Sequence, residues 1–164
     1  MMGLHHREPG VVGAVVDSPD SFVAEIIGDG IHVHPAAARM LHRLKGSVGI
    51  ALVSDAVEFL GKPDGVYRYR KRKVTIADGR VSLDDGTLCG SARPLNRSVM
   101  FLQQVCGLSL VDIADITSTN PARLLGLAQK GSIALGQDAD LVAMDRMGSI
   151  RLTLVGGVKV YLNL

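Results

Sequence analysis

The feature that most constrains the fold is a short apolar run at residues 50–53, Ile-Ala-Leu-Val, followed at once by Ser54 and Asp55. An apolar run of this length, bounded by turn residues, is typical of a strand that is buried on both faces in a parallel sheet. Catalytic groups of α/β folds lie just beyond the carboxyl ends of such strands. Asp55 is therefore the first candidate catalytic residue. The pattern leaves one alternative open, in which Asp55 is an N-cap for the next segment.

The segment before this run predicts a strand–helix–strand unit. Residues 22–27 are a second run of the buried-strand type. Residues 35–44 predict a helix, because Pro35 stands at its first position and apolar residues follow at helical spacing. Two strands joined by such a helix predict a parallel pair with a right-handed crossover. Residues 11–16 leave helix or strand open, and residues 18–20 favour a turn.

The rest of the chain predicts short strands, then helices, then short strands again. Residues 57–90 contain short alternating runs, and the Asp78-Gly79 pair between two of them predicts a hairpin. Three helical segments follow: residues 97–106, a helix from the Ser109–Asp112 capping box to about residue 116, and a short helix capped by Asn120. Short strands return after residue 130 and end in a hairpin at Gly156-Gly157.

The composition narrows the class of protein. Of the 164 residues, 47% are hydrophobic and 21% are charged, which is typical of a globular domain. A net charge of +2 gives no support for a nucleic-acid partner. Cys89 and Cys106 lack metal-ligand spacing, which favours free thiols in a reducing compartment. Residues 1–10 form no apolar leader, and no apolar run reaches the roughly 18 residues of a membrane helix, so we expect a cytoplasmic protein without a membrane partner.

Six segments carry a resemblance to a known family. In order, they are residues 4–10 (LHHREPG), 27–35 (IGDGIHVHP), 52–56 (LVSDA), 85–91 (DGTLCGS), 117–126 (TSTNPARLLG) and 130–142 (KGSIALGQDADLV). Together they resemble the C-terminal part of the N-acetylglucosamine-6-phosphate deacetylases, a family of the amidohydrolase superfamily. The resemblance covers essentially the whole chain. Its first two segments are the most specific to this deacetylase family, and the last two occur in many amidohydrolases.

The resemblance implies an α/β fold, in which a (β/α)8 metal-dependent hydrolase barrel stands beside a small β-sandwich. Residues 1–128 would be part of the barrel, with a β-hairpin excursion at about residues 64–90. Residues 129–164 would be the C-terminal strands of the sandwich. The earlier part of the barrel, where the family keeps its metal-binding glutamate and histidines, has no counterpart here. We therefore expect a truncated chain or one piece of a longer polypeptide.

The activity implied by the resemblance is hydrolysis of N-acetyl-D-glucosamine 6-phosphate to D-glucosamine 6-phosphate and acetate. Asp55 would accept a proton from a metal-bound water and return it to the leaving nitrogen. The full-length enzyme would use a divalent metal, with zinc expected, and would form a homodimer. No metal ligand is assigned to this chain, so we expect it to be inactive alone.

The resemblance also implies a set of substrate contacts. His32 would lie near the acetyl group and the sugar, and Arg7 would bind the phosphate, sometimes that of a neighbouring subunit. Backbone contacts would come from two short segments: Asp29 and Gly30, then Leu88, Cys89 and Gly90. The alternatives are a satisfied loop histidine, a solvated arginine and plain turn chemistry. A zinc site at His32 and His34 is a lesser possibility, since the family's ligands lie elsewhere.

Two other functions compete with this interpretation. The chain could be a non-catalytic sugar-phosphate-binding or subunit-interaction remnant that uses Arg7 and His32. The basic run at residues 68–73 could bind nucleic acid, although a solvated hairpin explains it better. This run is more basic than the family pattern. Residues 92–94, Ala-Arg-Pro, also depart from the small apolar residues that usually follow Gly-Ser in the family.

Overall fold

The parallel pair predicted around Asp55 is present in the structure, a computed structural model that describes residues 2–18 and 22–163. Strands β1 (Ala24–Ile27) and β2 (Ile50–Val53) pair in parallel, with Ala24 opposite Ile50 and Ile27 opposite Val53. Helix α2 (Pro35–Lys45) connects them, and a short 3-10 turn, η1 (Ser47–Gly49), precedes β2. The strand–helix–strand prediction is therefore confirmed.

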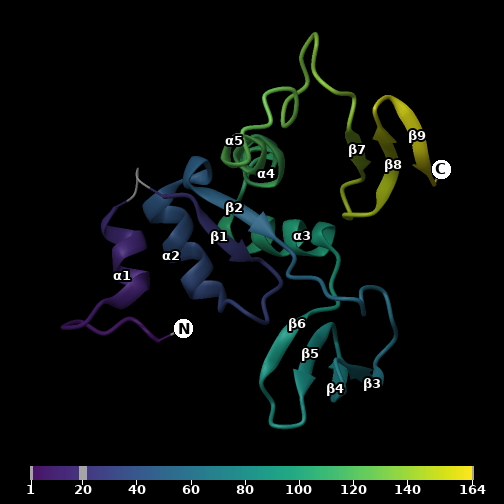
Figure 1. Ribbon diagram of the computed structural model, residues 1–164. Helices are drawn as coiled ribbons and strands as arrows, with labels where there is room; N and C mark the ends of the chain where they lie inside the picture. Colours follow the sequence, from purple (N-terminus) through teal and green to yellow (C-terminus); the bar gives the residue numbers. More distant parts are fainter. Residues whose placement is uncertain (1, 19–21, 164) are drawn as a thin grey trace.

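This parallel unit is buried by helices on its flanks (Figure 1). Helix α3 (Leu95–Cys106) contributes Val99 and Leu102 to a core that also contains Ile26 and Leu52. Residues 11–16, left open by the sequence, belong to helix α1 (Gly10–Asp17). The predicted turn at residues 18–20 lies partly outside the described residues. The described residues form a parallel sheet of two strands, so the fold is mixed α/β and no closed barrel is present in this part.

Residues 65–91 form a second sheet, drawn below the parallel pair in Figure 1. Its four antiparallel strands follow one another in sequence order: β3 (Gly65–Tyr69), β4 (Arg72–Ala77), β5 (Arg80–Leu83) and β6 (Leu88–Ser91). The turn between β4 and β5 is Asp78-Gly79, as predicted, with φ of 49° and 77°. The sheet occupies nearly the predicted range but contains four strands instead of a single hairpin, and it has its own core, built from Phe59, Val74, Ile76, Val81 and Ala92.

The basic run at residues 68–73 is the solvated hairpin end of this sheet. Its arginines and lysines are exposed, whereas Tyr67 and Tyr69 face inward, with their ring centroids 5.4 and 5.7 Å from that of Phe59. The aromatic and basic side chains therefore lie on opposite faces, because successive strand residues alternate. A nucleic-acid surface needs both kinds of side chain on one face, so the arrangement favours the solvated hairpin.

The helical stretch after α3 differs from the prediction at its second half. The capping box is confirmed, since the Ser109 hydroxyl and the Asp112 carboxylate each accept a backbone N–H of the other residue. Helix α4 (Leu110–Ala114) then continues through a π-helical turn, η2 (Asp115–Thr119), into α5 (Asn120–Leu124). The prediction that Asn120 caps a separate helix is wrong. Its buried amide donates instead to the carbonyls of Ser47 and Ile50, at 2.8 and 2.7 Å.

The last strands form a third sheet, at the right of Figure 1 in yellow-green and yellow. Strands β7 (Leu141–Met144), β8 (Ile150–Val155) and β9 (Val158–Leu162) are antiparallel. The predicted turn at Gly156-Gly157 joins β8 to β9. None of the helices formed by the described residues has the length and apolar character that crossing a bilayer requires.

Candidate functional site

The candidate site lies where β1 and β2 end. Because the two strands are parallel and in register, their carboxyl ends open onto the same edge of the sheet. The loop after β1 carries Asp29, Gly30 and His32, and Asp55 follows β2. His32 Nε2 lies 3.9 Å from Asp55 Oδ2. The structure therefore brings together two of the residues that the sequence pointed to, from segments that are more than twenty positions apart in the chain.

Asp29 is the anchor of this loop. Its buried carboxylate accepts the backbone N–H groups of Ile31 and His32, both at 2.9 Å, and Oδ2 lies 2.8 Å from His32 Nδ1. Burial raises the pKa of the Asp29 carboxyl, but the hydrogen bonds from the His32 and Ile31 backbone and from the His32 ring outweigh it, so that the pKa lies below its ordinary value. The ionised carboxylate can only accept, so Nδ1 of His32 carries a hydrogen and Nε2 is the nitrogen that faces Asp55.

Asp55 has a different environment. Its side chain is 50% exposed, and its backbone has a φ of 47°, a left-handed conformation that costs a non-glycine residue about 1 kcal/mol and that recurs at functional sites. Its carbonyl, not its carboxylate, is fixed, because it accepts the N–H of Ser91 at 2.9 Å. In the described chain the next regular element is the strand β3, so the N-cap alternative is wrong.

Strand β6 packs against the backbone of Asp55. Gly90 has a φ of 116°, and a Cβ at this position would lie 2.6 Å from Val57 Cγ1 and 3.1 Å from the carbonyl oxygen of Asp55. A side chain here would therefore push the Asp55 backbone away. Leu88 and Cys89 of the same strand are half-buried, and Cys89 packs against the core of the four-stranded sheet. Burial raises the pKa of the Cys89 thiol, which makes it a poor nucleophile.

Gly30 is also required by close packing. Its φ of 74° favours glycine, and a Cβ there would lie 2.7 Å from Cε2 of the Phe101 ring on α3. The loop from Asp29 to His32 therefore packs against α3, while the Asp29 carboxylate accepts hydrogen bonds from the backbone of the same loop. Gly30 thus lies at the site for a structural reason, and its role as a substrate contact stays a prediction.

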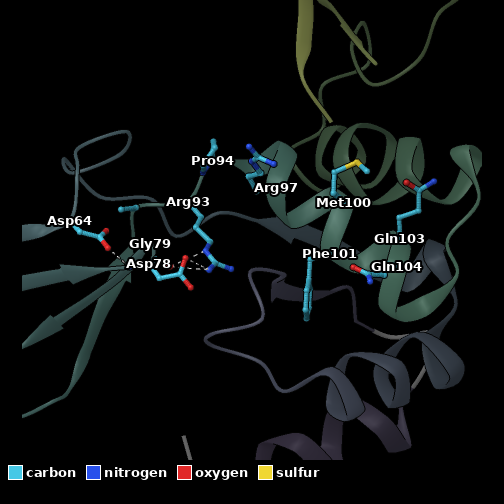
Figure 2. A pocket seen from close by; sticks show the side chains of 11 residues that line it. Asp64, Asp78, Gly79, Arg93, Pro94, Arg97, Met100, Phe101, Gln103 and Gln104 are labelled. Carbon is cyan, nitrogen blue, oxygen red and sulfur yellow. Dashed lines mark hydrogen bonds and ion pairs between the residues drawn. The ribbon is translucent and has the colours of Figure 1, made fainter. Parts of the chain in front are cut away.

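Sequence reasoning missed Arg93. Its guanidinium donates from Nη1 to the Asp29 carbonyl at 2.8 Å, and from Nε and Nη2 to the Asp78 carbonyl at 3.2 and 2.9 Å. One signal was available, the departure of residues 92–94 from the pattern of the family that the sequence resembles. Figure 2 shows Arg93 beside the Asp78 turn, and both residues line a cavity that Arg97, Met100 and Phe101 line from α3. The cavity has a volume of about 830 Å³.

Arg7 lies in the loop before α1. Its guanidinium nitrogen Nη1 is 3.1 Å from Nε2 of His6, whose ring centroid lies 4.4 Å from that of His5. In Figure 1 this purple loop is drawn below α1, away from the end of β2. The structure therefore does not bring Arg7 to the Asp55–His32 pair within one chain.

The residues do not fit a metal site. No group of three or more His, Cys, Asp or Glu side chains in the described part of the chain is arranged to hold a metal ion. The two histidines considered as a zinc pair have separate partners, because His32 Nδ1 contacts Asp29 whereas His34 Nδ1 accepts the N–H of Ala36 and caps α2.

Comparisons with known proteins identify the family to which the chain is related. A family model described as "Amidohydrolase family" matches residues 12–160. The N-acetylglucosamine-6-phosphate deacetylase of Bacillus subtilis is 41% identical over 158 residues, which are 96% of this chain and 40% of that protein. The deacetylase of Vibrio furnissii is 40% identical over 162 residues, again 40% of its length. The chain thus spans about two fifths of the curated relatives it matches.

Solved structures give the same result. The crystal structure of N-acetylglucosamine-6-phosphate deacetylase from Thermotoga maritima superposes with a TM-score of 0.92 at 33% identity, covering 99% of this chain and 44% of that one. A variant of the Mycobacterium smegmatis deacetylase, solved in complex with N-acetyl-D-glucosamine-6-phosphate, has a TM-score of 0.89 at 29% identity over 98% of this chain and 43% of that one. The family match covers most of the sequence, and the chain belongs to the amidohydrolase family.

Proposed function

We propose that this chain supplies the Asp55–His32 part of a deacetylase active site that hydrolyses N-acetyl-D-glucosamine 6-phosphate to D-glucosamine 6-phosphate and acetate. The observation that carries the proposal is the placement of a half-exposed carboxylate 3.9 Å from a histidine that a second, buried carboxylate orients. The names of the relatives support the substrate. Residues 1–128 would then be part of a (β/α)8 barrel and residues 129–164 part of a β-sandwich.

The carboxylates of Asp55 and Asp29 have different roles in this proposal. When a water molecule attacks the acetyl carbonyl carbon, Asp55 accepts the proton that the water loses. As the bond between carbon and nitrogen breaks, Asp55 returns this proton to the nitrogen, and the products are acetate and the free amine. Asp55 suits this role because its carboxylate is accessible, whereas the carboxylate of Asp29 is occupied by three hydrogen bonds.

His32 contacts the substrate through Nε2. Its ring cannot rotate freely, because Nδ1 donates to Asp29 at 2.8 Å and the His32 backbone N–H donates to the same side chain. The histidine therefore presents one nitrogen at a fixed place beside Asp55. Such preorganisation lowers the cost of reaching the transition state. Backbone groups of Asp29, Gly30, Leu88, Cys89 and Gly90 would line the same place.

Arg7 would bind the phosphate of a substrate held by a second copy. This proposal follows from the place of its loop, which lies away from the end of β2, and from the bidentate fit of a guanidinium to phosphate. It makes a homodimer part of the proposed function. Disrupting the dimer should then raise KM for the phosphorylated substrate without abolishing turnover.

A divalent metal, with zinc expected, would be held by residues outside this chain and would supply a water of lowered pKa. The chain alone is therefore expected to bind the sugar phosphate without turning it over. That expectation also describes the second candidate function, a non-catalytic sugar-phosphate-binding remnant, which the lack of a metal site among the described residues favours.

The test is a chimera in which this chain replaces the matching segment of the Bacillus subtilis relative. We expect the chimera to release acetate from N-acetyl-D-glucosamine 6-phosphate with added zinc, and the chain alone to release none. The unaltered relative is the positive control. A chimera that folds, binds D-glucosamine 6-phosphate and releases no acetate would support the non-catalytic alternative and contradict the proposed deacetylase.

A further inference from the structure

Arg93 joins two parts of the molecule that have separate cores. It follows β6 of the four-stranded sheet, and its side chain is 29% exposed. Two of its nitrogens donate to the carbonyl of Asp78, in the turn between β4 and β5, and Nη2 lies 3.0 Å from that residue's carboxylate. The remaining nitrogen, Nη1, donates to the carbonyl of Asp29, 64 positions away in the sequence. One guanidinium thus ties the sheet to the loop after β1.

The place of the Arg93 side chain is well defined. Its backbone N–H donates to the Ser91 hydroxyl at 3.1 Å, and the N–H of Ala92 donates to the carbonyl of Gly79 at 2.9 Å. Gly79 leaves room for the stem of the arginine, because a Cβ there would lie 2.4 Å from Arg93 Cγ. The fork of the guanidinium is needed as well, since its separate nitrogens reach two carbonyls at once and a lysine ammonium would reach one.

The residue at the far end of this link is the one that orients His32. The side chain of Asp29 binds the His32 ring and backbone, and its carbonyl accepts from Arg93. Asp29 is therefore held from both sides, by the loop that it organises and by the neighbouring sheet. The path from the Asp78 turn runs through Arg93 and Asp29 to His32 and ends at Asp55.

We propose that Arg93 is a positioning residue that couples the four-stranded sheet to the Asp29–His32 loop and so fixes the approach of His32 to Asp55. The catalytic meaning of this coupling rests on the proposed function, but the coupling itself is a property of the loop.

The test is nuclear magnetic resonance of the uniformly ¹⁵N-labelled chain, on four proteins: the unaltered chain, Arg93→Ala, Arg93→Lys and the control Arg97→Ala. Arg97 lines the same cavity from α3. At one fixed pH we expect Arg93→Ala to shift the His32 ring ¹⁵N signals. It should also speed hydrogen exchange of the Ile31 and His32 amides about tenfold, the effect of losing one charge-assisted hydrogen bond. Arg97→Ala should change neither, and thermal unfolding should show that all four proteins are folded.

Arg93→Lys keeps the experiment decisive if the alanine variant does not fold. A lysine keeps the charge and the stem but not the fork. If Arg93→Ala folds, an amide exchange rate in Arg93→Lys between those of the unaltered chain and Arg93→Ala supports the coupling through two carbonyls. If Arg93→Ala does not fold, an exchange rate in Arg93→Lys above that of the unaltered chain supports it. Unchanged His32 signals and exchange in Arg93→Lys and in any folded Arg93→Ala would overturn it.

The same variants in the chimera separate this proposal from the proposed function. If Arg93 positions His32, Arg93→Ala should lower kcat about tenfold with little change in KM, because the loop is misplaced more in the transition state than in the bound state. If the unaltered chimera is inactive while the His32 signals still respond to Arg93→Ala, the coupling stands and the deacetylase proposal falls.

Discussion

The ends of β1 and β2 carry aspartates with opposite environments. After β1, the carboxylate of Asp29 is fully buried and its oxygens accept three hydrogen bonds. After β2, the carboxylate of Asp55 is half-exposed and, within the described residues, makes one polar contact, the 3.9 Å approach to His32. Adjacent strand ends can therefore hold one carboxylate in a structural role and leave the other accessible. The first aspartate holds the histidine, and the second is accessible for the proton transfer that we propose.

The largest effect on stability should come from Asp29→Ala. Removing the carboxylate leaves two backbone N–H groups and the His32 ring without their acceptor, and the free energy of unfolding should fall by about 3 kcal/mol. Urea unfolding followed by circular dichroism measures it. Asp55→Ala is the matched control and should change the free energy by less than about 1 kcal/mol. Equal losses in both variants would erase the distinction between the two aspartates.

A smaller loss is expected from Gly90→Ala, which tests the support beneath Asp55. The new Cβ would approach Val57 Cγ1 to 2.6 Å at a φ of 116°, and we expect a loss of about 2 kcal/mol from strain and displacement. Gly86→Ala is the control, because Gly86 also has a positive φ, 82°, but its Cβ would meet open space. A loss no larger than that of the control would show that β6 does not press on Asp55.

The pH dependence of stability should single out Asp29. Its pKa in the folded chain lies below the ordinary value of 3.8, so ionisation of Asp29 stabilises the fold above pH 3.8, and this stabilisation is lost as the pH falls through the lower, folded value. The difference in unfolding free energy between the unaltered chain and Asp29→Asn should therefore be constant near neutral pH and shrink below pH 3.8. A difference that stays constant down to about pH 2, near the end of the accessible range, would contradict the assignment.

Local sequence patterns predicted the strands, helix ends and turns that depend mainly on neighbouring residues. The apolar runs placed β1 and β2, Pro35 marked the start of α2, and Asp78-Gly79 placed a hairpin turn. The first strand begins at Ala24 instead of Phe22, whose side chain is 54% exposed. A residue that stays exposed gains little from joining a buried strand, so the predicted boundary was two residues early.

The misses share one cause. Asn120 and Arg93 both donate to backbone carbonyls far away in the sequence, 70 or more positions for Asn120 and 64 for the Asp29 carbonyl. A backbone carbonyl is present at every residue and leaves no mark in the sequence, so neither partner could be predicted. Asp55 could be singled out because it follows a buried strand, whereas His32 was indicated by the family resemblance alone. The structure places the two close together because parallel strands bring their carboxyl ends to one edge.

The most direct test of the central claim is the rate of acetate release by the chimera carrying Asp55→Asn, measured beside its unfolding temperature. We expect turnover to fall by about 10²- to 10⁴-fold, because the amide cannot accept a proton. The unfolding temperature should stay within a few degrees of that of the unaltered chimera. Turnover within about twofold of the unaltered chimera would show that Asp55 is not the proton acceptor, and the division of roles between the two aspartates would be wrong.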